Sequence, residues 1–302
     1  MARKTWLEVS VNGPWSRDQQ PLIPITVGEI VAEGIACARA GAAIIHVHAY
    51  DERTGRQKDD PDLYAAIIEG IRAKEDVIVY PTIPFAGSID SPSALSASAR
   101  FQHTETLAKR GLLEWGVVDP GSTQISTLAE VPAGKEGFIY ANPESHVRWG
   151  LELANRYAFH PGYAIYEPGF LRLGAALARV HAALPQPVYR FMFSDGLSFG
   201  FPPERFGLEA YLHLLDRDAP DAPWMIAGLD VDVTPLIGFA VERGGHVRVG
   251  LEDAPFGSAK SNLQWVDDAV RRIRAAGGDL ATAADVRARL KESGSGAGRA
   301  SQ

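Results

Sequence analysis

Short apolar runs rich in β-branched residues alternate with amphipathic stretches along most of the chain. Eight of the apolar runs have the length and composition of strands, and a stretch with helical spacing of apolar positions follows nearly every one. We predict strands over residues 5–12, 42–50, 77–83, 112–119, 163–169, 188–194, 224–230 and 246–253. Strands that alternate with helices in this way are parallel, because each helix returns the chain to the start of the next strand.

Helix boundaries are marked by capping residues. Thr26 and Glu29 form a T-x-x-E capping box, in which each side chain can bind a free backbone N–H at the helix start. Gly41 is placed to end that helix in a left-handed conformation. Asp60 and Pro61 read as the cap and first residue of the next helix. Further helices are predicted over residues 91–111, opened by Ser91–Pro92, and over 145–157, 170–183, 204–217, 234–243 and 261–275.

The number and spacing of these units predict a closed barrel. Eight strand–helix units within about 250 residues fit a single TIM (β/α)8 barrel, which we expect to cover residues 1–290. An open doubly wound sheet is the main rival, but its first strand usually leads into G-x-G-x-x-G, whereas this chain has VNGPWS. The end of the chain, residues 291–302, is small and polar, and we expect it to be disordered.

Composition and charge narrow the class of protein. The chain has 302 residues, 46% of them hydrophobic, and a net charge of −7. This acidic balance argues against nucleic acid or an anionic membrane as a partner. No apolar run reaches the ~18 residues of a membrane span, and none follows the basic N-terminus as in a signal peptide. We therefore expect a soluble cytoplasmic protein, and a single cysteine, Cys37, excludes an internal disulfide.

Two histidines close the second predicted strand. Side chains alternate between the two faces of a strand, so His46 and His48 point the same way, together with Ile44. In a parallel barrel the strand ends carry the active site, and two imidazoles converging there suit a zinc ion. Taken alone, the H-x-H pair could also be two pocket histidines without a metal.

Charged residues gather at the end of the eighth predicted strand. Closure of the barrel brings this strand beside the first one, two places from the H-x-H strand. Glu252 could then supply a third ligand, which would leave an open coordination position as in catalytic zinc sites. Alone, Glu252 and Asp253 could also be a helix cap or a solvated loop. A shared metal site explains both strand ends at once.

Three blocks of sequence resemble a known family, the β-keto acid cleavage enzymes. They are IPIT (residues 23–26), AGAAIIHVHAYDERTGRQ (40–57) and GGHVRVGLED (244–253), with weaker similarity in YEPG (166–169) and WMIAGLD (224–230). The second and third blocks are specific and occur in the expected order and separation. The resemblance covers nearly the whole chain.

This resemblance implies a fold, a metal and a reaction. The family fold is a TIM barrel, and its members bind a divalent metal, usually zinc. By motif, His46 and His48 match the two histidine ligands, Glu252 the carboxylate ligand, and Arg248 and Asp253 a catalytic Arg–Asp pair. The reaction converts a β-keto acid and acetyl-CoA, bound as a second substrate, into acetoacetate and a new acyl-CoA. A homotetramer or another homo-oligomer is also implied.

The implied roles agree with the chemistry of the residues. A metal would act as a Lewis acid toward the enolate of the keto acid, and a carboxylate oriented by arginine could remove the C2 proton. Asp253 would be that base and Arg248 would position it. Arg248 could instead serve only as a salt bridge inside the barrel.

Departures from the family pattern lie in the strand-end loops, where specificity should reside. The turn after the third strand reads PTIPFAG in place of a Ser-Thr-Gly-Gly turn, and we expect Thr82 to take the place of the substrate-binding serine. After the first strand, Asn12 and Trp15 stand near an acidic residue that binds an amine in the aminohexanoate-cleaving member. They cannot supply that charge, so we expect Asn12 to contact a different substrate and Trp15 to form an apolar wall or pack as an ordinary aromatic.

Further candidates for substrate contact follow later strands. Asp230 and Asp232 stand where a Gly-Arg pair is common, and Asp230 and Glu167 could each contact a polar or cationic tail. Glu167 could equally be a loop hydrogen bond or a helix cap, and Asp230 a structural loop residue. Arg190, in the sixth strand, could bind a carboxylate, although a structural ion pair is the simpler interpretation.

Two other functions are compatible with a metal-binding barrel. An amidohydrolase-like enzyme also uses H-x-H, but on its first strand and with further histidines after strands five and six. Here His160 and His181 precede the fifth and sixth strands. A barrel that binds metal without catalysis is the second alternative.

Overall fold

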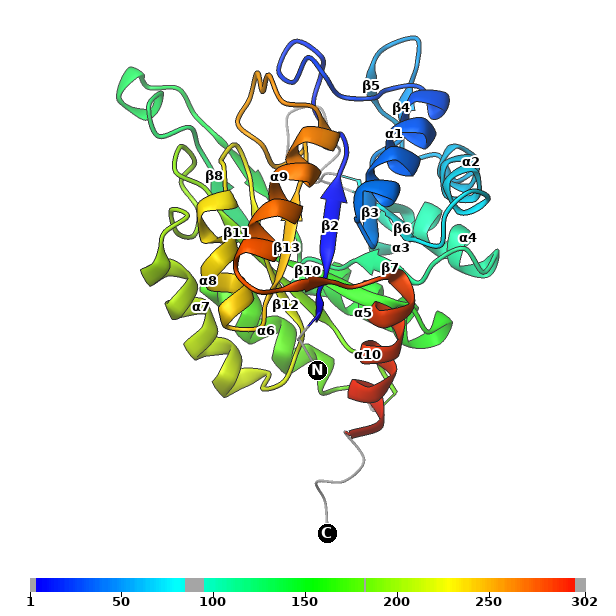
Figure 1. Ribbon diagram of the computed structural model, residues 1–302. Coiled ribbons are helices and arrows are strands. Elements are labelled where there is room, and N and C mark those ends of the chain that lie inside the picture. Colours follow the sequence, from blue (N-terminus) through cyan, green and yellow to red (C-terminus); the bar gives the residue numbers. More distant parts are fainter. Residues whose placement is uncertain (1–3, 85–94, 182, 297–302) are drawn as a thin grey trace.

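Eight parallel strands form the centre of the molecule in the computed structural model, which describes residues 4–84, 95–181 and 183–296 (Figure 1). In their order around the sheet they are β6 (Ile78–Pro81), β3 (Ile44–Val47), β2 (Leu7–Ser10), β13 (His246–Val249), β12 (Trp224–Gly228), β11 (Val188–Phe193), β10 (His160–Ile165) and β7 (Trp115–Val117). β6 and β7, at the two ends of this order, contact each other, so the ring is nearly closed. The predicted (β/α)8 barrel is confirmed.

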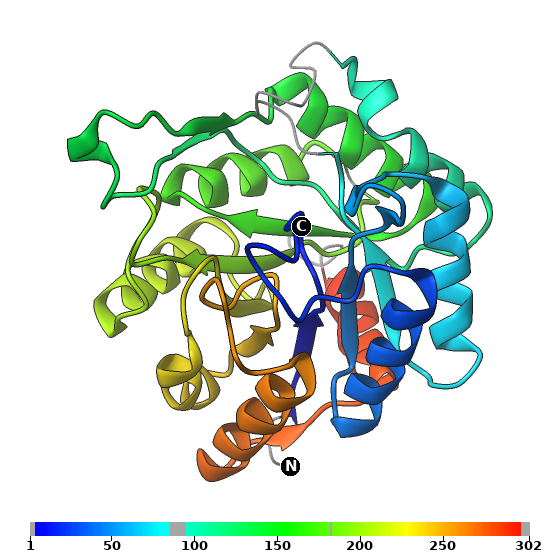
Figure 2. The same cartoon turned by 90° about the horizontal axis from the view of Figure 1, so that it is seen from above.

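Helices surround the ring of strands, as the view along the barrel shows (Figure 2). They are α1 (Val27–Ala40), α2 (Pro61–Arg72), α3 (Ala97–Arg100), α4 (Gln102–Lys109), α5 (Glu144–Tyr157), α6 (Pro168–Ala178), α7 (Arg205–Asp218), α8 (Ile237–Glu242), α9 (Asn262–Ala275) and α10 (Ala283–Gly296). Two 3-10 turns, η1 (Val131–Ala133) and η2 (Thr234–Leu236), complete the helical elements. The helices cover the outer face of the sheet and closure of the barrel buries the inner face, so the strands are buried on both sides.

Capping chemistry set the helix starts as expected. The Thr26 side chain accepts a hydrogen bond from the Glu29 N–H, and the Glu29 carboxylate accepts one from the Thr26 N–H. Asp60 caps α2, and Pro61 is its first residue. The start predicted at Ser91–Pro92 lies outside the described residues, within which Ser96 caps α3.

Each predicted strand differs from the observed one by at least one residue at an end, and two of these differences have a clear physical cause. The fifth strand runs over His160–Ile165 and ends before YEPG, because Pro168 fits the first turn of a helix and opens α6. The eighth strand ends at Val249 instead of continuing to residue 253. Gly250 has a φ of +137°, and a Cβ there would lie 2.1 Å from the Ser10 carbonyl oxygen, so the chain turns at a position that only glycine allows.

Short paired segments add to the barrel at both ends. β1 (Lys4–Thr5) pairs with β14 (Asp279–Leu280) at the N-terminal end of the strands. Two hairpins, β4 (Tyr50–Asp51) with β5 (Arg56–Gln57) and β8 (Thr123–Ile125) with β9 (Phe138–Tyr140), follow the second and fourth barrel strands. The β8–β9 hairpin forms an arm at the upper left of Figure 1, on the side where the strands end.

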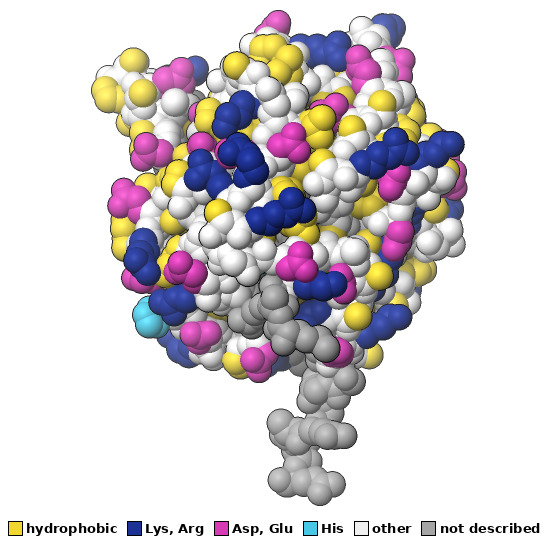
Figure 3. All heavy atoms as spheres, viewed as in Figure 1, with side chains coloured by type: hydrophobic (Ala, Val, Ile, Leu, Met, Phe, Trp, Pro, Cys, Tyr) yellow, Lys and Arg dark blue, Asp and Glu magenta, His cyan; other side chains and the backbone are white. Residues whose placement is uncertain are grey.

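The predicted disordered tail overlaps the last helix. α10 extends to Gly296, six residues into the segment 291–302 that we expected to be disordered, and residues 297–302 lie outside the described residues. Among the described residues, no helix has the length and apolar character to cross a bilayer. On the face seen in Figure 3, Lys and Arg side chains are interspersed with Asp and Glu.

Candidate active site

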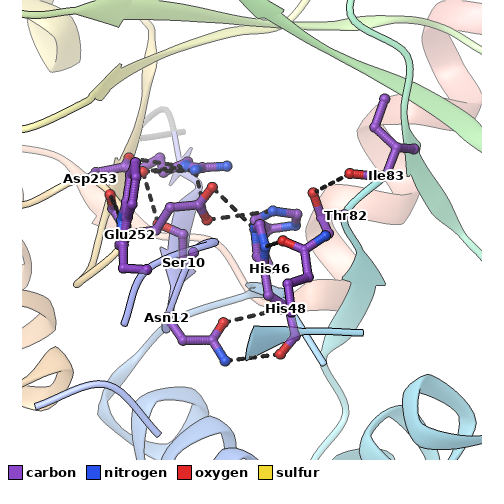
Figure 4. A network of polar contacts seen from close by, with 12 residues as sticks. Ser10, Asn12, His46, His48, Thr82, Ile83, Glu252 and Asp253 are labelled. Carbon is purple, nitrogen blue, oxygen red and sulfur yellow. Dashed lines mark hydrogen bonds and ion pairs between the residues drawn. The ribbon is translucent and has the colours of Figure 1, made fainter. Parts of the chain in front are cut away.

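Two histidines and a glutamate meet at the C-terminal ends of the strands. Their ligand atoms, one each from His46, His48 and Glu252, all lie within 4.8 Å of one another. The Glu252 carboxylate oxygens are 3.5 Å from His46 Nε2 and 3.3 Å from His48 Nε2. Figure 4 shows the carboxylate pointing toward both imidazoles. The three residues that the sequence singled out are therefore brought together.

Strand register explains this meeting. β2 lies between β3 and β13, with Ser10 opposite His46 and Val9 opposite Val249. The turn at Gly250 then carries the chain across the end of β2, where the Glu252 N–H donates to the Ser10 carbonyl at 3.3 Å. Strand alternation alone would have sent residues 252 and 253 to opposite faces, whereas the turn lets both lie near Arg248.

The donor set fits a divalent cation. Two imidazole nitrogens and one carboxylate oxygen are the ligands that catalytic zinc prefers, with one position left for substrate or water. Glu252 Oε2 is buried and accepts no hydrogen bond from the described residues. Burial lowers the pKa of His46 well below its usual value, which keeps its imidazole neutral. Burial acts to raise the pKa of Glu252, but Arg248 and the two histidines hold it well below its ordinary range.

His48 is held by a chain of polar contacts from the β5 hairpin. His48 Nδ1 is 2.8 Å from Gln57 Oε1, and Gln57 Nε2 donates to both carboxylate oxygens of Asp59, at 2.9 and 3.1 Å. Because the amide nitrogen must face that carboxylate, the amide oxygen faces the ring, and Nδ1 has to carry the proton. Nε2, the atom nearest Glu252, is then free to bind a metal. His46 has no such support, since its Nδ1 is buried without a hydrogen-bond partner among the described residues.

Asn12 has a different place from the one expected. Its amide donates to the His48 and Pro24 carbonyls, at 2.9 and 3.1 Å, and accepts from the His48 N–H at 2.9 Å. The side chain is fully buried, and all its hydrogen-bonding capacity goes to backbone, as Figure 4 shows for His48. Asn12 therefore positions the end of the H-x-H strand, and the expectation that it contacts substrate does not fit the structure.

Arg248 and Asp253 form a two-pronged ion pair. Arg248 Nε and one terminal nitrogen donate to the Asp253 carboxylate at 2.9 and 2.7 Å. The same terminal nitrogen is 3.1 Å from Glu252 Oε2. Ser10 and the Gly228 N–H also donate to Asp253, whose carboxylate is buried behind Arg248. Burial raises the pKa of Asp253, which makes it a better proton acceptor than an exposed aspartate.

A buried polar layer lies beneath the site, in which Arg190 has the ion-pair contact that the sequence analysis favoured, whereas Glu8 and Tyr80 were not foreseen. Tyr80 donates to Glu8 at 2.6 Å, and Arg190 donates to the Tyr80 hydroxyl at 2.7 Å. Arg248 donates to the same Glu8 oxygen, Oε1, at 3.2 Å, and Arg190 lies 3.8 Å from Glu8 Oε2 as an ion pair. A signal was present, because Glu8 and Ser10 alternate with Leu7 and Val9, which marks an inward polar face on the first strand.

A cavity of about 840 Å³ opens above these residues. His46, His48, Glu252 and Arg248 line one side of it, and Thr82 lines it as well. Trp15 lines the cavity and donates its indole N–H to the Glu252 carbonyl at 2.9 Å, so it also fixes the ligand loop.

Glu167 and Asp230 do not line this cavity. Glu167 accepts a hydrogen bond from Thr123 at 3.1 Å, and Asp230 accepts one from the Phe256 N–H at 2.8 Å. Asp230 also has a φ of +54°, typical of a tight turn. Both carboxylates tie loops together at the rim, so the expected substrate contacts are replaced by structural ones.

The histidines that a hydrolase of the amidohydrolase type would need are absent from the cluster. Among residues 4–84, 95–181 and 183–296, the group able to hold a metal consists of His46, His48 and Glu252. His160 is at the start of β10, at the opposite end of the barrel, with its ring 3.1 Å from the Gln186 carbonyl.

Residues 4–291 match the family model described as beta-keto acid cleavage enzyme. The chain belongs to this family. A relative named 3-oxoadipate:acetyl-CoA acetyltransferase, from Cupriavidus necator, is 29% identical over 96% of this chain and 95% of that protein. The 3-keto-5-aminohexanoate cleavage enzyme of Fusobacterium nucleatum is 25% identical over 90% of this chain and 92% of its own length.

Solved structures confirm the fold alone. The apo structure of ObcA superimposes with a TM-score of 0.70 at 18% identity, and the match covers 90% of this chain and 66% of that one. The chain's relatives include proteins named as acetyl-CoA transferases of 3-oxoadipate and of 3,5-dioxohexanoate. The chain is thus an enzyme of the same general kind.

Proposed function

We propose that this protein is a metal-dependent acyltransferase that converts a β-keto acid and acetyl-CoA into acetoacetate and a new acyl-CoA. The proposal is carried by one observation, the convergence of His46, His48 and Glu252 beside Arg248 at the mouth of the cavity. Zinc, or another divalent cation that His2Glu sites accept, is the proposed metal. When bound, it would act as a Lewis acid that stabilises negative charge on the enolate oxygen of the keto acid.

The charges of the site suit an anionic substrate. Within the buried cluster, two arginines, Arg190 and Arg248, face three carboxylates, those of Glu8, Glu252 and Asp253. With a divalent cation added, the balance changes from one negative to one positive charge. A β-keto acid, and the enolate formed from it, would then enter a cavity of complementary charge.

Asp253 is the proposed base and Arg248 the residue that positions it. The substrate carboxylate offers Arg248 a second anion, and a small shift of the guanidinium toward it would free an oxygen of Asp253 to accept the C2 proton. The C2 carbanion attacks the acetyl carbonyl, which forms a carbon–carbon bond and releases the CoA thiolate. The thiolate then attacks the original keto carbon, and the old C2–C3 bond breaks as the new acyl-CoA forms. The carbanion left at C2 takes the proton back from Asp253, which gives acetoacetate.

The discriminating experiment follows the acetyl carbons. Zinc-loaded protein is incubated with a panel of β-keto acids and acetyl-CoA labelled with 13C in the acetyl group. We expect both labelled carbons to appear as C3 and C4 of acetoacetate, and the unlabelled tail to appear as acyl-CoA. Label released as acetate, or cleavage without acetyl-CoA, would show a hydrolase and contradict the proposal. Protein stripped with a chelator is the control, and restoring zinc should restore turnover.

Other properties implied by the family stay predictions. We expect a homotetramer or another homo-oligomer, which light scattering after size-exclusion chromatography would test. A cytoplasmic location and the absence of a nucleic-acid or membrane partner are likewise expected from the sequence.

A further inference from the structure

One wall of the cavity differs in kind from the side that carries the candidate metal ligands. It is formed by the ends of β10, β11 and β12 together with the β8–β9 arm. In the ring of strands, β10 lies four places from β2 in either direction, and β11 four places from β3. This wall is therefore across the barrel from His46 and His48.

The wall is apolar and separate from the main core. We define the apolar wall by the five aliphatic side chains that line the cavity there, which are Ile125, Ala164, Met192, Leu197 and Leu229. They belong to a hydrophobic cluster of their own, apart from the core between the barrel and its helices. Tyr140 and Tyr166 border them, with ring centroids 5.5 Å apart.

A buried carboxylate is set into the edge of this wall, while Glu130 and the exposed Glu136 line the cavity farther out on the β8–β9 arm. Asp119 follows β7 and lines the cavity, although it is only 5% exposed. Tyr140 donates its hydroxyl to one carboxylate oxygen at 2.6 Å, and the Ala164 N–H donates to the other at 2.8 Å. Each oxygen of Asp119 thus has a donor, which stabilises its charged form inside the protein.

Cations near the apolar wall already have partners. Arg190 also lines the cavity, but it donates to the Tyr80 hydroxyl and is paired with Glu8, and its Nε, which has no hydrogen-bond partner among the described residues, is buried from solvent. Lys135, on the β8–β9 arm, is 2.7 Å from Glu130. A carboxylate brought against the wall would therefore lose water and meet the charge of Asp119 without gaining a free cation.

We propose that the apolar wall is the subsite for the tail of the β-keto acid, the part beyond C3, and that it accepts an uncharged aliphatic tail and rejects one that ends in a carboxylate. This inference rests on the proposed function, because it assumes that the keto acid head lies near His46, His48 and Glu252. The tail then points across the barrel to the apolar wall. The substrate would differ from that of the relative named for 3-oxoadipate, although that relative is 29% identical.

The test compares two acids with the same six-carbon chain. 3-Oxohexanoate ends in a methyl group and 3-oxoadipate in a carboxylate, and each is supplied with acetyl-CoA to the zinc-loaded protein. We expect kcat/KM for 3-oxohexanoate to be about 100-fold higher or more, because a buried charge without a partner is strongly disfavoured. Equal values, or a preference for 3-oxoadipate, would overturn the inference.

A binding measurement separates this inference from the proposed function. The 2,2-dimethyl analogues of both acids have no C2 proton to lose, and their binding to zinc-loaded protein can be measured by calorimetry without turnover. If neither acid yields acetoacetate but the uncharged analogue binds at least tenfold more tightly, the proposed function fails and the tail subsite stands. If the two analogues bind equally, the tail subsite fails whatever the turnover.

Variants test whether the apolar wall causes the preference for 3-oxohexanoate over 3-oxoadipate. Asp119→Asn keeps the size of the side chain and removes its charge, so we expect the ratio of the two kcat/KM values to fall about tenfold. Asp267→Asn, the same change at an exposed position on α9 that does not line the cavity, is the matched control and should leave the ratio unchanged. Leu229→Lys places a cation in the wall and should improve 3-oxoadipate in particular. A ratio that neither Asp119→Asn nor Leu229→Lys changes would refute the assignment to this wall.

Discussion

The two sides of the cavity are built on different principles. On the side of β2, β3 and β13, polar contacts hold most side chains in place, as in the chain from His48 through Gln57 to Asp59, and the few buried polar atoms without a hydrogen-bond partner include His46 Nδ1 and Glu252 Oε2. On the opposite side, the apolar wall consists of aliphatic side chains held by packing, with Asp119 as a fixed charge at its edge. Hydrogen bonds determine atom positions closely, whereas packing tolerates exchange of one aliphatic side chain for another.

This difference suggests a division of labour within one barrel. Chemistry shared by a family needs a fixed arrangement, and the polar side supplies it. Choice among β-keto acids needs a surface that can change at little cost to the fold, and the wall supplies that. Variants on the polar side should therefore alter metal binding or rate for every substrate, while variants in the wall should alter the preference among substrates.

The largest effect is expected from the ligands themselves. His46→Ala removes one of three ligands and should lower bound zinc to a trace and abolish turnover with all β-keto acids. Metal content by mass spectrometry and acetoacetate formation would be measured side by side. An unchanged circular dichroism spectrum would show that the fold survives. Full zinc content in this variant would contradict the ligand assignment.

Asp253→Asn should separate metal binding from catalysis. The asparagine keeps the shape of the side chain but cannot take a proton, so we expect kcat to fall by about 10²- to 10⁴-fold with zinc content unchanged. The exchange of the C2 hydrogen for deuterium, followed by NMR without acetyl-CoA, should be lost in parallel. A variant with the normal rate would show that Asp253 is not the base.

Gln57→Met should weaken the metal through the support of His48. Methionine fills a similar volume but offers no strong acceptor for Nδ1–H, so zinc affinity should fall about 10- to 100-fold. Competition with a chromogenic chelator measures this directly. Arg53→Met, at an exposed position in the turn of the same hairpin that does not line the cavity, is the control, and equal affinity in the two variants would argue against the support role of Gln57.

Met192→Ala tests the other side of the cavity. Removing the long side chain from the apolar wall enlarges the space for the tail, so kcat/KM should fall about 10-fold for a six-carbon substrate and fall less for a longer one. Zinc affinity should not change. A loss of kcat/KM that is equal for all tail lengths would contradict the assignment of the tail subsite to this side of the cavity.

The smallest effect concerns stability and pH. Burial raises the pKa of Asp119, so the charged form costs stability at neutral pH, and this cost disappears as pH falls through the raised pKa. We therefore expect Asp119→Asn to melt slightly higher than the parent protein at pH 7, by about 2 °C, with the gap closing toward pH 4. Differential scanning calorimetry of the metal-free proteins would measure the difference in melting temperature. A difference that grows on acidification would contradict this prediction.

Much of the fold could be predicted because it depends on local chemistry. The capping box at Thr26 and Glu29 and the Asp60 cap with Pro61 are determined by residues a few positions apart. The two histidine ligands could also be predicted from the sequence, since alternation along one strand places His46 and His48 on the same face. The predicted end of the eighth strand was wrong because it depends on a long-range contact: the turn at Gly250 lies close to the Ser10 carbonyl.

By itself, the sequence determined the order of strands and helices, the type of barrel and the residues able to bind a metal, because periodicity and side-chain chemistry are written along the chain. Only the tertiary structure decided that Asn12, Glu167 and Asp230 serve the framework, and that an apolar wall with Asp119 lies across from the metal side. These assignments depend on which partners each polar atom finds, and those partners come from strands that are distant in sequence and adjacent only after the barrel closes.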